Sequence, residues 1–359
     1  MVTLTRIAPT PSGFLHIGNA WSFILTWLIA RSQGSKIFLR IDDLDTSRFR
    51  IEYLEDIFIS LQWLGINWDA GPVDAQDFLA NYRQSFRHDQ YRQALEFLIK
   101  EKGNHSRVYA CQCSREQIKN ASIRPGIYPQ TCLEKNLPLQ ASKRGRLGKG
   151  IFSENSSTAI RINIPAEEMV EFEARKFFPA ESIGDFIIWQ KNGEAAYQLA
   201  SVVDDEELQM DFIVRGRDLI PSTSGQLFLA RQLNYKFFPE AQFFHHGLIL
   251  NTDGSKLSKS AGKEGSGLVM DQNLFPMTLK YWREENSKKG LPSLLTFFAQ
   301  CLGLANQGLD KPSPHLTIKS LPELLSAFQN RFMQKGKLNL AAIPRQDFSA
   351  QSLFDKWNA

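Results

Sequence analysis

Two lysines late in the sequence stand three residues apart in a loop rich in glycine and serine. The segment reads Lys256-Leu-Ser-Lys-Ser260 and follows an apolar run, His246 to Leu250, that we expect to be a strand. Ammonium groups at this spacing, flanked by hydroxyls, can hold a polyphosphate and stabilise charge that develops on it. Lysine pairs in loops are more often solvated surface, so the pair suggests a site only together with a second group.

A loop near the N-terminus offers that second group. Residues 9–19 read Pro-Thr-Pro-Ser-Gly-Phe-Leu-His-Ile-Gly-Asn and lie between a short apolar run, Thr5 to Ala8, and an expected helix. The start of a helix presents free backbone N–H groups and a partial positive charge, which favour an anion. Gly18 lets a flat base approach the backbone because it has no Cβ, and His16 can donate to a phosphate oxygen. The alternative is a proline-bounded helix start with a solvent-facing histidine.

Three of the four cysteines fall within 22 residues. They form Cys111-x-Cys113, followed by Cys132. So few cysteines argue against a disulfide scaffold and for a reducing compartment. Three thiols at tight spacing indicate a structural Zn²⁺ site, which needs four N, S or O ligands in a tetrahedron. By composition alone His105 is the natural fourth ligand, and the alternative is a set of buried thiols without metal. Cys301 stands in an apolar, helical setting, where we expect it to pack.

The elements that must position these loops alternate between strand and helix over the first hundred residues. Apolar residues recur on one helical face after Ile17, and the run Lys36 to Ile41 is typical of a buried strand. This alternation predicts a parallel, doubly wound sheet, in which ligands bind at the carboxyl ends of the strands. Between Tyr109 and Ser157 the alternation fails, which indicates an insertion. Elsewhere we expect strands at 159–164, 186–189 and 212–215, and helices at 52–64, 88–102, 197–203 and 225–233.

Composition bounds the remaining possibilities. The 359 residues suggest two or three folded units, and 43% hydrophobic with 22% charged residues exclude a disordered or fibrous chain. The sequence has 42 Lys and Arg residues and 38 Asp and Glu residues. This positive surplus is too small to indicate an extended basic surface that binds nucleic acid. The apolar run Phe23 to Ala30 is far shorter than the ~20 residues of a membrane span. No signal architecture precedes it, so we expect a cytoplasmic protein without membrane contact.

Three segments in this order resemble the signatures of class I aminoacyl-tRNA synthetases. They are Pro-Ser-Gly-x-x-His-Ile-Gly in residues 11–18, Arg-Ile-x-Asp-x-Asp in 40–45, and Lys-Leu-Ser-Lys-Ser in 256–260. Residues 5–13, 197–205 and 213–219 further resemble the glutamyl subgroup, so the likeness covers roughly residues 3 to 262. It implies an α/β fold: a Rossmann-type parallel-sheet catalytic domain split by a zinc-containing insertion, with a helical C-terminal tail. The implied segments are 1–108 and 191–262 for the catalytic domain, 109–190 for the insertion and 263–359 for the helical region.

The resemblance also implies an activity and the residues that perform it. ATP, accompanied by Mg²⁺, would lie between the two loops while a glutamate carboxylate attacks its α-phosphate to give glutamyl-adenylate. The implied catalytic residues are His16, Lys256 and Lys259. The implied ATP-binding residues are Pro11, His16, Gly18, Asn19 and Lys259. Glutamate needs cations for its two carboxylates, for which arginine is suited, and an anion for its ammonium; the implied set is Arg6, Ala8, Thr10, Asp42, Tyr197 and Arg215.

Three positions depart from the resembled pattern. Asn19 replaces a second histidine, Asp42 stands where glutamate is usual, and Ser201 replaces an asparagine. The shorter Asp42 side chain must sit closer to the ammonium or reach it through water. The first two changes are compatible with reduced activity, a reshaped pocket or a lost function.

Two features resemble the glutamyl-queuosine tRNA(Asp) synthetases in particular. Gly-Ile-Tyr-x-x-x-Cys in residues 126–132 follows the Cys-x-Cys pair, which implies zinc held by Cys111, Cys113, Tyr128 and Cys132. Residues 324–330 and 338–344 resemble the short tail of that group, and 99 residues follow Ser260. The likeness implies a monomer that activates L-glutamate without tRNA and transfers it to queuosine in the wobble position of tRNA(Asp). Basic residues of a loop at 142–150 would contact RNA phosphates or be merely solvated: Lys143, Arg144, Arg146 and Lys149.

Two other functions stay open. A truncated glutamyl-tRNA synthetase would charge an ordinary tRNA 3′ end, and a silent paralogue would bind tRNA or an amino acid without catalysis. The joint presence of the implied site residues argues against silence, since no structural need requires all of them: Arg6, His16, Tyr197, Arg215 and Lys259.

Overall fold

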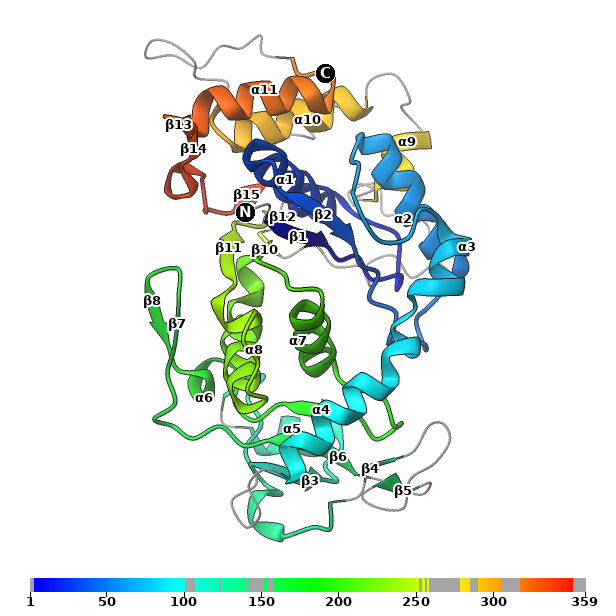
Figure 1. Ribbon diagram of the computed structural model, residues 1–359, viewed down its shortest axis with the longest axis vertical. Coiled ribbons are helices and arrows are strands. Elements are labelled where there is room, and N and C mark those ends of the chain that lie inside the picture. Colours follow the sequence, from blue (N-terminus) through cyan, green and yellow to red (C-terminus); the bar gives the residue numbers. More distant parts are fainter. Residues whose placement is uncertain are drawn as a thin grey trace. The chain divides into compact units, whose positions relative to one another are not determined.

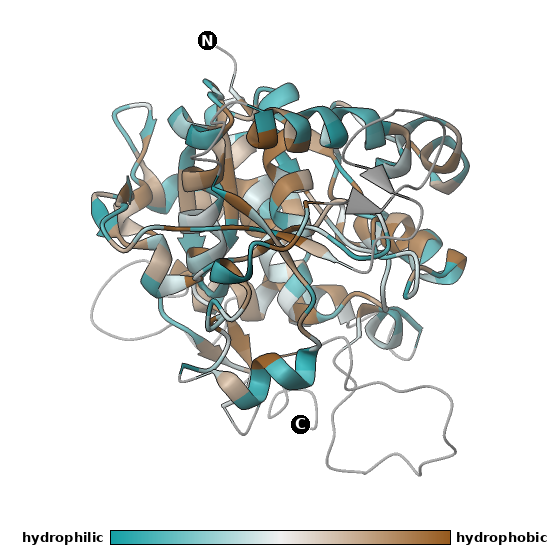
Figure 2. Ribbon diagram, turned by 90° about the horizontal axis from the view of Figure 1, so that it is seen from below, coloured by the Kyte–Doolittle hydropathy of each residue, from teal (hydrophilic) through white to brown (hydrophobic). Residues whose placement is uncertain are grey.

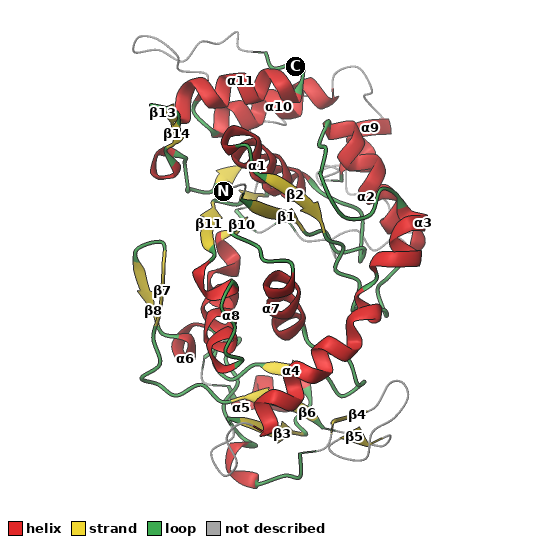
Figure 3. Cartoon of the chain, in the orientation of Figure 1, coloured by secondary structure: helices red, strands yellow, loops and turns green. Residues whose placement is uncertain are grey.

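The computed structural model describes residues 3–100, 107–122, 124–139, 141–142, 152–153, 158–251, 254–255, 257, 278–284, 290–304 and 317–350. Helices and strands alternate through these residues in an α/β arrangement (Figures 1 and 3). The chain divides into two compact units. The terminal unit comprises Met1–Arg83, Phe212–Arg217 and Phe244–Ala359; the middle unit comprises Gln84–Asp211 and Asp218–Phe243. This division is coarser than the four segments expected from the sequence, whose boundaries stay a prediction.

The terminal unit begins with a strand–helix–strand unit. Strand β1 (Leu4–Ile7) pairs in parallel with β2 (Lys36–Leu39), from Leu4 opposite Lys36 to Ile7 opposite Leu39. Helix α1 (Ile17–Gln33) connects them, as predicted. Its residues Phe23 to Ala30 are all buried, so this part of the helix is buried on every side and not on the single face that the spacing predicts. Strand β10 (Phe212–Gly216) lies beside β1 and pairs with β11 (Gln242–His246). β1 with β2 and β12 with β15 pair in parallel. A wider parallel sheet stays a prediction.

The described part of the terminal unit also contains helices beyond α1. They are α2 (Ile51–Leu64), α3 (Ala75–Asp77), α9 (Leu279–Glu284), α10 (Gly290–Cys301) and α11 (Leu321–Phe332). In Figure 2 the helices carry brown and teal stretches side by side, as amphipathic helices do. The expected helical C-terminal region also holds short strands. β13 (Met333–Gln334) and β14 (Lys337–Leu338) form a hairpin, while β15 (Phe348–Ser349) pairs in parallel with β12 (Ile249–Leu250).

The middle unit is built around a three-stranded antiparallel sheet of order β3 (Val108–Cys111), β6 (Ala159–Ile162), β9 (Ile187–Trp189). Its helices are α4 (His88–Lys100), α5 (Arg115–Ala121), α6 (Pro179–Ser182), α7 (Tyr197–Glu207) and α8 (Ile220–Gln232). Two short pairs complete it: β4 (Ala141–Ser142) with β5 (Phe152–Ser153), and β7 (Val170–Phe172) with β8 (Arg175–Phe177). A helix that could span a membrane is not found in the described part of the chain.

In the middle unit one expected helix start was wrong, and one hairpin was not expected. Helix α8 starts at Ile220, earlier than the predicted Gly225, because Pro221 occupies its first turn, where a missing N–H costs nothing. The serines and threonine that follow have modest helix propensity, and this hid the start. The β7–β8 hairpin was not predicted. Its turn residues Glu173 and Ala174 have positive φ of 51° and 55°, a conformation that sequence patterns associate with Asn-Gly.

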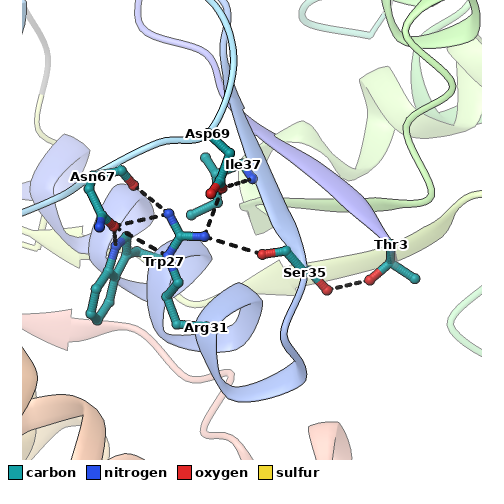
Figure 4. A network of polar contacts seen from close by, with 7 residues as sticks. All are labelled: Thr3, Trp27, Arg31, Ser35, Ile37, Asn67 and Asp69. Atoms are coloured by element: carbon teal, nitrogen blue, oxygen red, sulfur yellow. Dashed lines mark hydrogen bonds and ion pairs between the residues drawn. The ribbon is translucent and has the colours of Figure 1, made fainter. Parts of the chain in front are cut away.

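A polar network fastens α1 to β2 and the loop that follows α2. Seven residues form it, all labelled in Figure 4: Thr3, Trp27, Arg31, Ser35, Ile37, Asn67 and Asp69. Arg31 Nη1 donates to Asp69 Oδ2 at 2.7 Å, and Arg31 Nη2 donates to the Asn67 carbonyl at 2.9 Å. Asp69 Oδ2 also accepts from the Ile37 backbone at 2.7 Å. One carboxylate therefore joins the end of the helix to the second strand.

Replacing Asp69 with asparagine is expected to lower the free energy of unfolding by about 1 kcal/mol at neutral pH. Burial alone would raise the pKa of Asp69, but the Arg31 and Ile37 hydrogen bonds outweigh it and lower that pKa. A lowered folded-state pKa contributes stability above the unfolded value of about 3.9, and this is lost as pH falls through the folded-state pKa. Urea unfolding at pH 7 and near pH 3 checks this. The difference between variant and parent should shrink in acid, and exposed Asp89→Asn should show little effect at either pH.

Candidate functional site

The loop expected to hold a nucleotide leads directly into α1. His16 is the N-cap of the helix, and its Nδ1 accepts from the Asn19 backbone N–H at 3.3 Å. In return, Asn19 Oδ1 accepts from the His16 backbone N–H at 3.0 Å. This reciprocal pair is a capping box, in which two helix-start donors are satisfied at once. Asn19, which stands where the resembled family has a second histidine, therefore helps to cap α1. Its ATP-binding role stays a prediction.

The second loop approaches this helix start through Leu257. A Cβ placed on Gly18 would lie 3.1 Å from Cε1 and Nδ1 of His16 and 3.5 Å from Cδ1 of Leu257. Leu257 is 4% exposed and belongs to the same apolar core as Ile17. In the sequence it stands between Lys256 and Lys259, both of which lie outside the described residues. Leu257, from the second of the two predicted loops, thus lies close to Gly18 of the first.

A later segment also holds the first loop. His16 forms an isolated antiparallel bridge with Thr278, and the Leu279 N–H donates to the Leu15 carbonyl at 2.7 Å. Leu15 and Leu279 are each fully buried. The loop is therefore held from a distant part of the chain, a contact that no local pattern indicated.

Two of the predicted glutamate-binding residues lie on neighbouring strands. Arg6 is on β1 and Arg215 on β10, and their exposed fractions are 5% and 4%. Guanidinium groups are costly to bury and tend to be matched by anions with planar geometry. Two such groups on adjacent strands suit a ligand with more than one carboxylate. Their assignment to glutamate stays a prediction.

Asp42 lies beside the predicted backbone segment and is engaged by a residue that sequence analysis did not assign. The Asp42 N–H donates to the Pro9 carbonyl at 2.9 Å, which places it next to the stretch from Ala8 to Thr10. Arg40 forms a bidentate ion pair with the Asp42 carboxylate. Arg40 Nε donates to Oδ1 at 2.7 Å, and Arg40 Nη2 donates to Oδ2 at 3.2 Å. The role of Asp42 toward an ammonium stays a prediction.

Tyr197 belongs to the middle unit, where it is the first residue of α7 and 44% exposed. Ser201 lies one turn further along and is buried. A carboxylate near the other end anchors the helix: Asp204 accepts from Arg87 Nε at 2.7 Å, from the Tyr91 hydroxyl at 2.8 Å and from Gln84 Nε2 at 2.9 Å. These hydrogen bonds hold α7 in place within the middle unit. The glutamate-binding role of Tyr197 stays a prediction.

The predicted metal ligands converge within the middle unit. The three thiol sulfurs of Cys111, Cys113 and Cys132 all lie within 4.8 Å of one another. The Tyr128 hydroxyl lies 3.3 Å from Cys111 Sγ and 3.4 Å from Cys113 Sγ, and Cys113 Sγ lies 3.4 Å from Cys132 Sγ. With Zn–S bonds of about 2.3 Å, sulfurs of a tetrahedral site are roughly 3.8 Å apart. Three sulfurs and one oxygen at these distances fit a tetrahedral zinc.

The protonation of these groups depends on their mutual contacts. Burial raises the pKa of the Cys113 thiol, and the Cys132 thiol adds to this. Burial and hydrogen bonds with the thiols also raise the pKa of Tyr128. Burial alone would raise the pKa of Cys132, but hydrogen bonds from Tyr128 and the Gln112 backbone outweigh it and bring that pKa to about 7. Zinc binding to this set would therefore release protons.

Two cations border the cluster. The guanidinium carbon of Arg161 lies 3.7 Å from the centre of the Tyr128 ring, and Arg161 Nη1 donates to the Asp185 carbonyl at 2.8 Å. Lys191 Nζ donates to the backbone carbonyls of Gln112 at 2.8 Å and Cys113 at 3.3 Å. Such charges would offset the negative charge of a thiolate-rich metal site and hold its loop. His105 lies outside the described residues. Cys301 is buried in α10 within the terminal unit's core, as expected.

Comparisons with known proteins place the chain in a family. The family described as "tRNA synthetases class I (E and Q), catalytic domain" matches residues 2–281. A Glutamyl-Q tRNA(Asp) synthetase of Symbiobacterium thermophilum is 38% identical over 72% of this chain and 78% of its own length. The corresponding protein of Nitratidesulfovibrio vulgaris is 36% identical over 71% and 76%. A Glutamate--tRNA ligase of S. thermophilum is 33% identical over 81% of this chain, which spans only 60% of that ligase.

A solved structure agrees at the level of the fold. The crystal structure of a glutamate tRNA ligase from Elizabethkingia meningosepticum has a TM-score of 0.65 at 20% identity, covering 99% of this chain and 68% of that one. Together with the family match over most of the chain, this confirms the resemblance read from the signature loops. The chain belongs to the class I tRNA synthetases for glutamate and glutamine.

Proposed function

We propose that this protein activates L-glutamate with ATP and transfers the glutamyl group to a tRNA. The observation that carries the proposal is the closeness of Leu257 to Gly18, since a Cβ on Gly18 would lie 3.5 Å from Leu257 Cδ1. Leu257 stands between Lys256 and Lys259 in the sequence, and Gly18 belongs to the start of α1. The buried arginines on β1 and β10 belong to the same unit. Nucleotide and dicarboxylate would then share one site. The names of the relatives support the same chemistry.

In the first reaction, a carboxylate oxygen of glutamate attacks the α-phosphorus of ATP. A bond from that oxygen to phosphorus forms, the bond to the bridging oxygen of the β-phosphate breaks, and pyrophosphate leaves. Arg6 and Arg215 would hold carboxylates, while Asp42 and the Ala8–Thr10 backbone would face the ammonium. His16, Lys256 and Lys259 would stabilise the phosphate charge, which Mg²⁺ arriving with ATP also offsets.

In the second reaction, a hydroxyl of the tRNA attacks the activated carbonyl carbon. An ester bond forms, AMP leaves with the bonding electron pair, and the hydroxyl proton is released. Positioning and electrostatics are sufficient for both steps, so no protein nucleophile is required.

We propose queuosine of tRNA(Asp) as the acceptor of the glutamyl group. The support is the coverage of the two Glutamyl-Q relatives, of which this chain spans 78% and 76%, and the Cys–Cys–Tyr–Cys cluster. Charging of an ordinary tRNA 3′ end is the second candidate, favoured by the 33% identity to a glutamate ligase. Activity as a cytoplasmic monomer stays a prediction.

Glutamate-dependent ATP–pyrophosphate exchange, measured with and without tRNA, is expected to proceed without tRNA. Radioactive glutamate should then be transferred to tRNA(Asp) carrying queuosine and not to the same tRNA lacking it. Exchange that requires tRNA(Glu), with transfer to its 3′ end, would instead support the second candidate. No exchange under any of these conditions would indicate a silent paralogue.

We also propose that Cys111, Cys113, Tyr128 and Cys132 hold a structural zinc ion. These residues form a small apolar cluster of their own with Tyr109, packed by Ile118, Leu133 and Leu137. So small a cluster buries little surface, and metal ligation would contribute the stability that it lacks. Zinc would cross-link the loop that runs from Cys111 to Cys132.

A further inference from the structure

The segment 345–350, here called the C-terminal strap, runs alongside the strand that leads to the Lys256–Ser260 loop. Its strand β15 pairs in parallel with β12, Phe348 opposite Ile249 and Ser349 opposite Leu250. The Phe348 N–H donates to the Leu248 carbonyl at 2.8 Å, and the Ala350 N–H donates to the Leu250 carbonyl at 3.0 Å. The strap and β12 thus form a two-stranded parallel sheet, and β12 is the strand that precedes the Lys256–Ser260 segment in the sequence.

Asp347 connects this strand to a second segment of the site. Its Oδ1 accepts from the Leu248 backbone N–H at 2.8 Å, and its Oδ2 forms an ion pair with Arg217 Nη2. Arg217 follows β10, the strand that carries Arg215. The Asp347 side chain is 17% exposed. One carboxylate therefore joins the strand entering the second loop to the end of the strand that carries a candidate glutamate-binding arginine.

The strap is closely packed, so its position is well defined. A Cβ on Gly247 would lie 1.7 Å from the Gln346 carbonyl oxygen, a distance that only glycine permits. The Arg345 guanidinium carbon lies 4.5 Å from the centre of the Phe244 ring. The Phe348 ring meets the Trp21 ring edge-on at 5.9 Å, and Trp21 Nε1 donates to the Gly247 carbonyl at 2.9 Å. Trp21 belongs to α1, whose start carries His16 and Gly18.

We propose that Asp347 is a positioning residue for adenylate formation, a role that rests on the proposed function. By holding Leu248 and Arg217 together, it fixes the spacing between the strand that enters the phosphate-binding loop and the strand that presents Arg215. Misplacement of reacting groups by about 1 Å can cost a hundredfold in rate, so a brace at this junction acts on turnover. It touches neither ATP nor glutamate and acts through its two partners.

Steady-state exchange kinetics of Asp347→Ala test this role. The variant should lower kcat by about tenfold, with the KM for glutamate changed much less. Asp347→Glu should recover part of kcat because it restores the charge opposite Arg217. Arg217→Gln should also lower kcat, and the double variant should be no worse than either single one, since the two residues act as one unit. Asp69→Asn, which weakens an unrelated network of the same unit, should leave kcat unchanged.

Amide hydrogen exchange of the unliganded protein gives a second readout. Asp347→Ala should speed exchange at Leu248 and along β12 but leave β1 and β2 protected. If the unaltered protein is active and Asp347→Ala leaves kcat or the protection of β12 unchanged, the positioning role is overturned. The proposed function is not affected by that result. Absence of pyrophosphate exchange in the unaltered protein would overturn the proposed function, and with it the role of Asp347. A loss of kcat equal in Asp69→Asn would show general destabilisation and also overturn the role.

Discussion

Arg215→Ala is expected to lower kcat/KM for glutamate in the pyrophosphate exchange reaction by at least tenfold, on the order of 1.4 kcal/mol or more. Arg215 is 4% exposed, so its guanidinium interacts in a setting that water screens weakly. A planar, two-pronged cation is suited to a carboxylate, and alanine removes both prongs. The loss should appear chiefly as a raised KM for glutamate. Exchange measured over a range of glutamate concentrations at saturating ATP checks this.

Three further measurements separate binding from folding in this experiment. Arg215→Lys keeps the charge but loses the planar fork, so its activity should lie between those of the parent and the alanine variant. Arg231→Ala removes an exposed arginine of the middle unit and should exchange normally. Thermal melting of all variants shows whether the core has suffered. Wild-type glutamate kinetics in a folded Arg215→Ala protein would refute the assignment of Arg215 to the substrate.

Much of the candidate site could be predicted because its signals are local. The apolar spacing after Ile17 predicts the helix, although it does not reveal that Phe23 to Ala30 are buried on every side. The Cys-x-Cys pair is also local, because two thiols at this spacing can bind one metal. The Asn19 capping role was missed, although a side-chain acceptor three residues after an N-cap is a recognisable signal. Asn19 was compared only with the second histidine of the resembled family, and its possible role as a helix cap was not considered.

The contacts that the sequence did not reveal join segments far apart in the chain. Nothing in the spacing near Gly18 indicates that Leu257 will pack against it, or that Thr278 will bridge to His16. Asp347 likewise appears in the sequence as an ordinary polar residue of a tail. Such contacts depend on how strands and helices pack together, which single-residue types constrain weakly. The β7–β8 hairpin was missed for another reason, since its turn adopts positive φ with residues that seldom do so.

The Arg40–Asp42 pair illustrates how structure refines a predicted role. The sequence suggested that the shortened Asp42 must reach toward an ammonium, but Arg40 already holds both of its oxygens. Residues two apart on an extended segment point to the same side, so this pairing was open to prediction. Arg40 therefore orients the carboxylate and offsets part of its charge. The role of Asp42 toward an ammonium stays a prediction.

The zinc prediction has the largest expected structural effect. The purified protein should contain one equivalent of zinc, and Cys113→Ser should lose it. Cys113 contacts two other members of the cluster, with Sγ 3.4 Å from both the Tyr128 hydroxyl and Cys132 Sγ. A serine hydroxyl is a poor replacement for a thiolate ligand of zinc. Elemental analysis of dialysed protein measures the metal, and thermal melting measures the accompanying loss of stability.

Cys301→Ser is the matched control, because it also replaces a buried thiol but lies in the apolar core of α10. It should cost stability and keep the full equivalent of zinc. Tyr128→Phe removes only the phenol oxygen; it should weaken zinc retention against a chelator while Arg161 still packs on the ring. A parent protein that is folded, free of zinc and unable to bind added Zn²⁺ would show that these are buried thiols. The three sulfurs would then be held together by the packing of this cluster, to which the two tyrosines, Ile118, Leu133 and Leu137 contribute. Cys113→Ser would change that packing little.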